Sequence, residues 1–105
     1  MPRSDALDFP RGGIQARYIE LPKDELLAVY LQQGIPGHDA QGFHRTGTLD
    51  LVLLLEGRLR LLLDEGEVVL EPGDVVVQRD TNHAWRAGDD PARCFVVVSR
   101  PEDLP

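Results

Sequence analysis

The sequence is poor in cysteine and in long apolar runs, and each absence narrows what the protein can be. Cys94 is the only cysteine, so no disulfide can form within the chain and a reducing compartment is expected. No apolar run approaches the ~20 residues that a membrane-spanning helix needs. The first 13 residues, MPRSDALDFPRGG, contain no apolar stretch typical of a signal peptide. We therefore expect a cytoplasmic protein with no membrane partner.

Basic residues are also scarce. The chain has 11 lysines and arginines against 18 aspartates and glutamates, which gives a formal net charge of −7. A chain this acidic is repelled by a phosphate backbone, so nucleic acid is not an expected partner. The length of 105 residues suits one domain with a single core.

From residue 43 onward the sequence contains short apolar runs that alternate with turn residues. Runs such as LDLVLLL, RLRLLLD and DVVVQR end at pairs such as Glu56-Gly57 and Glu65-Gly66. Glycine supplies the positive φ angle that a tight turn needs, and proline or aspartate favours the turn around it. Closely spaced short strands predict an all-β sandwich or barrel rather than β-α-β units.

The N-terminal third is less regular. Residues 1–13 are polar and end in a glycine pair, so we expect a flexible arm followed by a β-barrel domain over 14–105. The segment ELLAVYLQQ, residues 25–33, fits either a helix or a strand. Its short length between Pro22 and Gly34 favours a strand.

The strand expected around residues 49–55 is apolar on both faces. One face carries Leu49, Leu51, Leu53 and Leu55, and the other carries Val52 and Leu54. A barrel of this size has few layers of its own with which to cover an outer leucine face. We therefore expect a homodimer in which a second copy covers it.

Polar side chains of equal parity lead into the inner face of that strand. They are His44, Thr46, Thr48 and Asp50. Alternate residues of a strand point to the same side, and polar groups entering an apolar interior are costly unless they are paired or used. His83 and Trp85 share a face of a later strand in the same way. If both faces line one barrel, His44, Asp50 and His83 converge, and two imidazoles with a carboxylate suit a divalent metal.

The stretches HRTGTLD (44–50) and GDVVVQRDTNHAW (73–85) resemble the two motifs of a small single-domain cupin. His44 stands at the first histidine of the first motif, Thr46 at its second histidine and Asp50 at its glutamate. Gly57 stands at the closing glycine, and His83 at the histidine of the second motif. The resemblance covers roughly half of the chain. It implies the cupin double-stranded β-helix, a jelly-roll barrel.

One group of small bacterial cupins is similar in more detail. In that group the first motif carries threonine and aspartate where this chain has Thr46 and Asp50, and the second motif contains Gln-Arg-Gly. Here Asp80 replaces that glycine, and Ala87 stands where the group has asparagine. These two departures leave the implied fold unchanged.

The resemblance implies a pocket lined by both motifs. The candidates for catalysis and for metal ligation are His44, Asp50 and His83. The candidates for substrate contact are Thr46, Thr48, Gln78 and Trp85. The cofactor is a divalent ion such as zinc, iron, manganese or nickel, or the site is metal-free and its histidines and carboxylate act as general acid and base. Two alternatives stay open: Asp50 as a structural partner of Thr48, and His38 as a lid residue or an extra ligand rather than an exposed loop residue.

The function is expected to be conversion of a small molecule. The resemblance favours a lyase, dehydratase or isomerase that transfers a proton on a carbonyl-bearing, polyketide-like or aromatic metabolite of natural-product biosynthesis. A metal-dependent oxygenase is the alternative within the enzyme class. A non-catalytic small-molecule-binding cupin is the alternative outside it.

Overall fold

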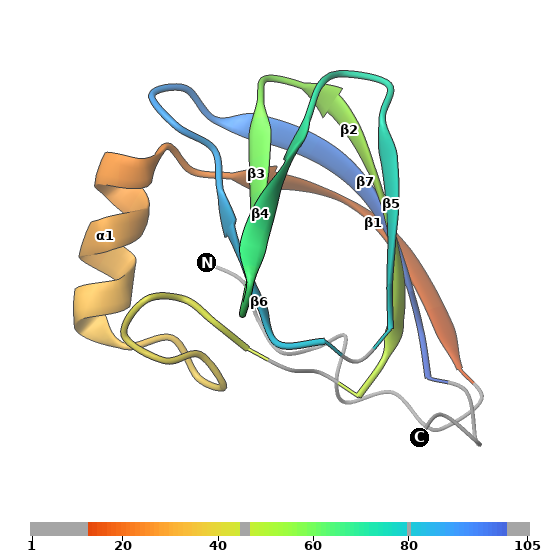
Figure 1. Cartoon of the computed structure of the whole chain (residues 1–105), viewed down its shortest axis with the longest axis horizontal. Helices are drawn as coiled ribbons and strands as arrows, with labels where there is room; N and C mark the ends of the chain where they lie inside the picture. The colour runs from red at the N-terminus through yellow and green to blue at the C-terminus, as the bar shows by residue number, and fades with distance from the viewer. Residues whose placement is uncertain (1–12, 45–46, 80, 101–105) are drawn as a thin grey trace.

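Two antiparallel sheets face each other and form the body of the molecule (Figure 1). The computed structural model describes residues 13–44, 47–79 and 81–100. Its helix and strands within these ranges are β1 (Ile14–Leu21), α1 (Asp24–Gln33), β2 (Leu49–Glu56), β3 (Leu59–Leu63), β4 (Gly66–Leu70), β5 (Val75–Arg79), β6 (His83–Arg86) and β7 (Ala92–Ser99). One sheet has the order β1-β7-β2-β5, and the other has the order β4-β3-β6. The predicted all-β jelly-roll barrel is confirmed.

Alternating side chains of β2 and β7 build the core between the sheets. In β2, Val52 and Leu54 are buried, whereas Leu51 and Leu55 are exposed. The buried residues of β7 are Ala92, Cys94, Val96 and Val98. Full burial of a valine or leucine side chain contributes about 1.5–3 kcal/mol. This apolar seam fixes the wall of the barrel that carries Asp50.

The segment 25–33 is a helix, so the strand predicted there is wrong. Asp24 and Glu25 lie in the first turn, where their negative charges favour the positive end of the helix dipole. Gly34 ends the helix with φ 87°, and its N–H donates to the Leu31 carbonyl. Leu27 is the one buried residue of the helix, and it is 8% exposed. The short length of the segment favoured a strand. The acidic first turn and the glycine at the C-terminal end favour the helix that the structure has.

The first residue of α1 attaches the helix to the barrel. The Asp24 N–H donates to the Gly88 carbonyl (2.8 Å), and the Gly88 N–H donates to Asp24 Oδ1 (3.0 Å). The helix therefore lies at the side of the barrel (Figure 1). None of the helical residues described form a segment long and apolar enough to cross a membrane.

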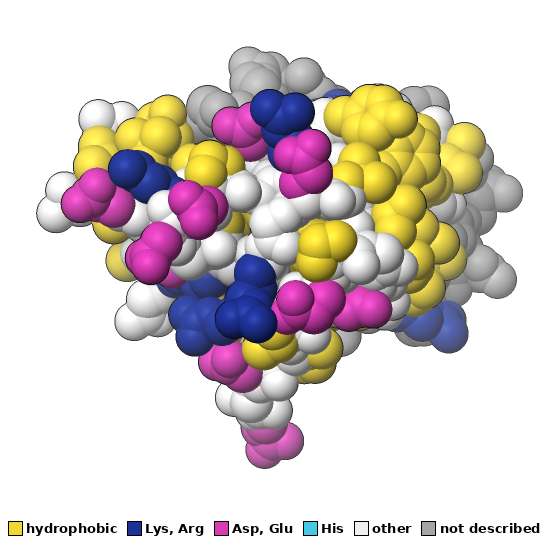
Figure 2. Space-filling model, turned by 90° about the horizontal axis from the view of Figure 1, so that it is seen from above, with side chains coloured by type: hydrophobic (Ala, Val, Ile, Leu, Met, Phe, Trp, Pro, Cys, Tyr) yellow, Lys and Arg dark blue, Asp and Glu magenta, His cyan; other side chains and the backbone are white. Residues whose placement is uncertain are grey.

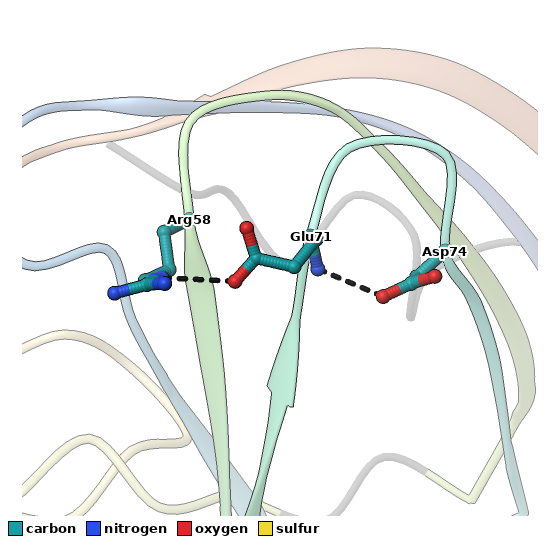
Figure 3. A network of polar contacts seen from close by, with 3 residues as sticks. All are labelled: Arg58, Glu71 and Asp74. Atoms are coloured by element: carbon teal, nitrogen blue, oxygen red, sulfur yellow. Dashed lines mark hydrogen bonds and ion pairs between the residues drawn. The ribbon is translucent and has the colours of Figure 1, made fainter.

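One end of the barrel is formed by tight turns, and we call residues 56–58, 71–74 and 87–91 the turn end. Figure 3 shows its polar network, in which Arg58 Nε donates to Glu71 Oε2 (3.0 Å) and the Glu71 N–H donates to Asp74 Oδ2 (2.8 Å). The Asp74 N–H in turn donates to the Glu71 carbonyl (2.9 Å). These contacts satisfy the polar groups of the turn before β5.

Gly57, at the same end, has a conformation and surroundings that require glycine. Its φ angle is 91°. A Cβ added there would lie 2.8 Å from the Pro91 carbonyl oxygen and 3.1 Å from Ala92 Cα. The two turns thus meet backbone to backbone, which explains why a glycine closes this motif.

The predicted arm lies almost entirely outside the described residues. β1 begins at Ile14, directly after Gly13, and residues 1–12 are not described. The division into an arm over 1–13 and a barrel domain over 14–105 therefore stays a prediction.

Candidate functional site

The two histidines predicted for the site, His44 and His83, lie side by side in the barrel wall. His44 and His83 form an antiparallel bridge in which each N–H donates to the other carbonyl (2.9 and 3.0 Å). Directly opposed residues of a bridge project to the same side, and their ring centroids lie 4.3 Å apart. The sequence placed these residues in separate motifs, and the fold brings them into contact.

His83 is oriented by its own backbone turn. Its Nδ1 lies 2.7 Å from the Thr81 carbonyl oxygen. Because a carbonyl can only accept a hydrogen bond, Nδ1 carries the proton and Nε2 of the neutral ring keeps a free lone pair. The side chain is buried, and burial lowers the pKa of His83, an effect that the Thr81 carbonyl and Asp50 partly oppose. At neutral pH this ring is a base with a defined acceptor atom.

His44 is held neutral still more strongly. Burial, followed by repulsion from the rings of His83 and His38, lowers the pKa of His44 to about 4. Its Nδ1 atom is buried and has no hydrogen-bond partner of good geometry in the part of the chain that the structure describes, although the nearby Gly42 backbone acts to raise the pKa of His44. An unpaired buried nitrogen is costly, so this atom is a candidate for contact with a ligand.

Asp50 is half-buried beside the histidines. It accepts a hydrogen bond from the Thr48 hydroxyl (2.7 Å), which is the structural pairing considered above. Burial raises the pKa of Asp50, while that bond and the charge of His83 act to lower it. The carboxylate and His83 therefore influence each other, and Asp50 has both a structural contact and an electrostatic one.

The remaining predicted contact residues lie around the same group. Gln78 is opposite Asp50 in the β2–β5 register and is buried, and its Oε1 has no hydrogen-bond partner among residues 13–44, 47–79 and 81–100. Its Nε2 makes a long hydrogen bond to the Thr81 hydroxyl (3.4 Å). Trp85 packs against the core and presents an edge to His83, with ring centroids 5.9 Å apart. Thr46 lies outside the described residues, so its role stays a prediction.

His38 belongs to this group, although the sequence favoured an exposed loop residue. Its ring centroid lies 4.1 Å from that of His44, and the side chain is half-buried. The loop is shaped by Asp39, whose Oδ1 accepts the N–H groups of Gln41 (2.8 Å) and Phe43 (2.9 Å). These two bonds lower the pKa of Asp39. The loop thus folds back and places a third imidazole on the pair.

Arg86 is a residue that sequence reasoning missed. Its guanidinium donates to the Trp85 and Gln41 carbonyls, so it connects β6 to the His38 loop. It also lines a groove of about 460 Å³ between that loop and the Leu27 side of α1. An arginine directly after the NHAW stretch was the available signal, but only the fold reveals its partner 45 residues away.

We call the residues brought together here the histidine end. They are His38, His44, Thr48, Asp50, Gln78, His83 and Trp85. Two of their nitrogens, His83 Nε2 and His44 Nδ1, have the donor chemistry that a divalent metal accepts. Within the described ranges, however, no group of three His, Cys, Asp or Glu side chains is arranged to hold a metal ion. The ligand set of His44, Asp50 and His83 therefore stays a prediction.

Comparison with known sequences identifies the family. Residues 31–98 match the family model described as cupin domain. Phomopsin biosynthesis cluster protein C' of Diaporthe leptostromiformis is 52% identical over 44 residues, which are 41% of this chain and 23% of that protein. Cupin-domain-containing oxidoreductase fogC of Aspergillus ruber is 44% identical over 43 residues, 40% of this chain and 21% of that protein. The matched stretch thus spans less than a quarter of the length of these relatives.

Solved structures agree on the fold. A cupin-2 domain protein of Shewanella frigidimarina superposes with a TM-score of 0.59 at 11% identity, covering 85% of this chain and 72% of that one. DMSP lyase DddQ of Ruegeria pomeroyi superposes with a TM-score of 0.61 at 20% identity, covering 90% of this chain and 42% of that one. At these identities the similarity establishes the barrel and nothing about the substrate.

Proposed function

The chain belongs to the cupin domain family, and on this basis we propose that its histidine end transfers a proton on a small carbonyl-bearing molecule. The observation that carries the proposal is the pair His44–His83, two adjacent imidazoles that are both kept neutral. Such a pair suits a lyase, dehydratase or isomerase, with one ring to take a proton and one to polarise a carbonyl.

His83 is the proposed base. The Thr81 carbonyl holds the proton on Nδ1, so Nε2 accepts a proton from a carbon next to the substrate carbonyl. The positive charge that then develops on the ring is stabilised by Asp50, which already raises the pKa of His83. Asp50 is in turn oriented by the Thr48 hydroxyl.

His44 is the proposed electrophilic partner. The His44 ring remains neutral down to a pH of about 4. Its N–H group can donate a hydrogen bond to a developing enolate oxygen while the ring itself stays uncharged. His38 covers this ring and, with Trp85 at the edge of His83, supplies flat surfaces suited to an aromatic or polyketide-like substrate. The names of the biosynthesis-cluster relatives support a natural-product substrate.

A metal is compatible with this proposal, but no step depends on it. The unprotonated ring nitrogens of His83 and His44 would hold a divalent ion. Such an ion would polarise the carbonyl of the substrate. The mechanism above uses only the side chains that the structure describes.

The test is deuterium incorporation into 1-tetralone, an aromatic ketone with exchangeable α-protons, followed by proton NMR in heavy water. The wild-type protein should exchange these protons faster than free imidazole at equal concentration. His83→Ala should lose at least ~100-fold of that rate, as expected for removal of a general base, while keeping its circular-dichroism spectrum. Binding of the ketone with equal exchange in both proteins would contradict proton transfer and favour a binding module. Parallel samples with a chelator or with added zinc, iron, manganese or nickel report whether a metal assists.

An oxygenase is the second candidate, and one observation favours it. Several matched relatives carry the name cupin-domain-containing oxidoreductase. Oxygen consumption by the iron-loaded protein in the presence of 1-tetralone, abolished in His83→Ala, would support this candidate. No consumption above the metal-free sample would count against it.

A further inference from the structure

The carbonyl that orients the His83 ring lies outside the sheet. β6 starts at His83, at the end of the barrel opposite the turn end (Figure 1). Figure 2 looks onto the turn end and shows charged side chains there but none of the histidines. Pairing with Leu63 on one side and His44 on the other fixes the backbone of His83 itself. Thr81, whose carbonyl accepts the Nδ1 hydrogen, is two residues earlier and exposed, so its orientation depends on contacts other than the ladder.

Asn82, the residue between Thr81 and His83, is held by Asp64 of the neighbouring hairpin. The β3–β6 register pairs Leu63 with His83, and continuing it by one residue in each strand places Asp64 opposite Asn82. Asn82 Nδ2 donates to Asp64 Oδ1 (3.0 Å). A hydrogen bond to a carboxylate is stronger than one between neutral groups. Asp64 also starts the two-residue turn between β3 and β4, so the hairpin fixes the acceptor.

The Asp64–Asn82 bond acts on His83 through the peptide unit that joins Thr81 to Asn82. The bond is exposed whereas the His83 ring is buried, so it holds this peptide from outside and leaves the pocket free. A peptide unit is planar, and fixing Asn82 at one side of it therefore limits rotation of the Thr81 carbonyl at the other. Gln78 Nε2 reaches the Thr81 hydroxyl as well, but over 3.4 Å. The Asp64–Asn82 bond is the shorter of these two contacts.

We propose that Asp64 and Asn82 are positioning residues, which act through the Thr81 carbonyl to keep the His83 proton on Nδ1 and present Nε2 to the pocket. The consequence for catalysis rests on the proposed function, in which Nε2 is the base. The hydrogen bond of one ring nitrogen determines which nitrogen of a neutral histidine carries the proton. Without the pair, the ring populates both tautomers, and a ring with its proton on Nε2 accepts none there.

The experiment is long-range ¹H–¹⁵N NMR on the chelator-treated full chain, at a pH where the rings are neutral. Wild-type His83 should carry its proton on Nδ1, whereas Asn82→Ala should show a measurable Nε2-protonated form with an unchanged circular-dichroism spectrum. If Asn82→Ala fails to fold, Asp64→Ala removes the same bond from its other side. Glu65→Ala is the matched control, because Glu65 is an exposed carboxylate of the same turn that is not part of the bond, and its tautomer should match the wild type.

An exchange of the two side chains tests the direction of the argument. Asn82→Asp alone sets two carboxylates opposite each other, which is unfavourable, and should disturb the tautomer most. Adding Asp64→Asn restores one amide and one carboxylate with the bond reversed, so the double variant should return His83 to the Nδ1 form. The rate of 1-tetralone exchange should follow the same order, with a loss of about 10-fold or more in Asn82→Ala, as is usual for a residue that orients a histidine of a site.

The tautomer and the exchange rate separate two kinds of failure. An unchanged His83 tautomer in the alanine variants, an equal change in Glu65→Ala, or no rescue by the double variant overturns the positioning role. A tautomer that follows the expected order in a protein that does not exchange 1-tetralone supports the positioning role and contradicts the proposed proton transfer alone.

Discussion

The two ends of the barrel differ in how far their polar groups are hydrogen-bonded. At the turn end, Arg58, Glu71 and Asp74 satisfy one another, and Gly57 lets two backbone turns touch (Figure 3). At the histidine end, His44 Nδ1 and Gln78 Oε1 are buried and have no hydrogen-bond partner among the described residues. The first arrangement stabilises the fold. The second arrangement lowers the free energy of unfolding, as is typical of a site whose missing hydrogen-bond partner is a ligand.

The largest change in the free energy of unfolding is expected at Gly57, in the turn end. Gly57→Ala should lower it by about 3 kcal/mol or more, because a left-handed φ angle and a 2.8 Å backbone contact both oppose a Cβ. Gly73→Ala is the control, since Gly73 has φ 95° but no atom within 4 Å of its Cβ position, and it should lose only about 1–2 kcal/mol. Urea unfolding measures both, and equal losses would refute the close contact.

Acid should destabilise the histidine end through His44. The folded-state pKa of about 4 lies below the ordinary value of 6.5, so between these values the unfolded chain binds more protons. The free energy of unfolding should therefore fall as the pH is lowered from 6.5 to 4, by about 2 kcal/mol from this ring after solvent screening. His83 acts in the same direction, whereas the raised pKa of Asp50 acts in the opposite one.

His44→Phe isolates that contribution. Urea unfolding at neutral pH and at pH values between 4 and 6.5 should give a smaller acid loss for the variant than for the wild type. Identical losses would mean that His44 is not held neutral by its surroundings.

Gln78 gives a smaller effect with the opposite sign. Gln78→Met removes a buried unpaired oxygen at nearly constant shape, so the free energy of unfolding should stay equal or rise by about 1 kcal/mol. Ligand binding should weaken in the same variant. A loss of stability in thermal unfolding would show that the Gln78 side chain supports the fold instead.

The smallest effect is expected at Arg58. Its ion pair with Glu71 is exposed, so Arg58→Ala should lower the free energy of unfolding by only about 0.5 kcal/mol. High salt should remove most of the difference between this variant and the wild type. A loss above that of Gly73→Ala would show that the turn end depends on this pair.

The sequence predicted the parts of the molecule that local chemistry determines. Turn residues and apolar runs predicted the strands, whereas the single strand that the parity of His44 with Asp50 assumed is not present, because β2 begins at Leu49 and His44 forms an isolated bridge with His83. The strand predicted over 25–33 is wrong, and the structure has a helix there. The burial of Leu27 and the attachment of the helix to Gly88 depend on distant residues, so the sequence pattern alone did not indicate them.

Long-range contacts also explain what was missed at the site. The place of His38 depends on the Asp39 turn and on Arg86, which reaches the loop from β6. Neither contact follows from spacing along the chain. The pairing of Asp50 with Thr48, two residues apart, could be considered from the sequence because it is local.

The measurement that tests the central claim most directly is a long-range ¹H–¹⁵N NMR titration of the three imidazoles. We expect His83 to be neutral at pH 7 with its proton on Nδ1, and His44 to become protonated only near pH 4. Titration of either ring at or above the ordinary value of 6.5, or a proton on Nε2 of neutral His83, would contradict it. The histidine end would then lack the neutral base on which the proposed chemistry depends.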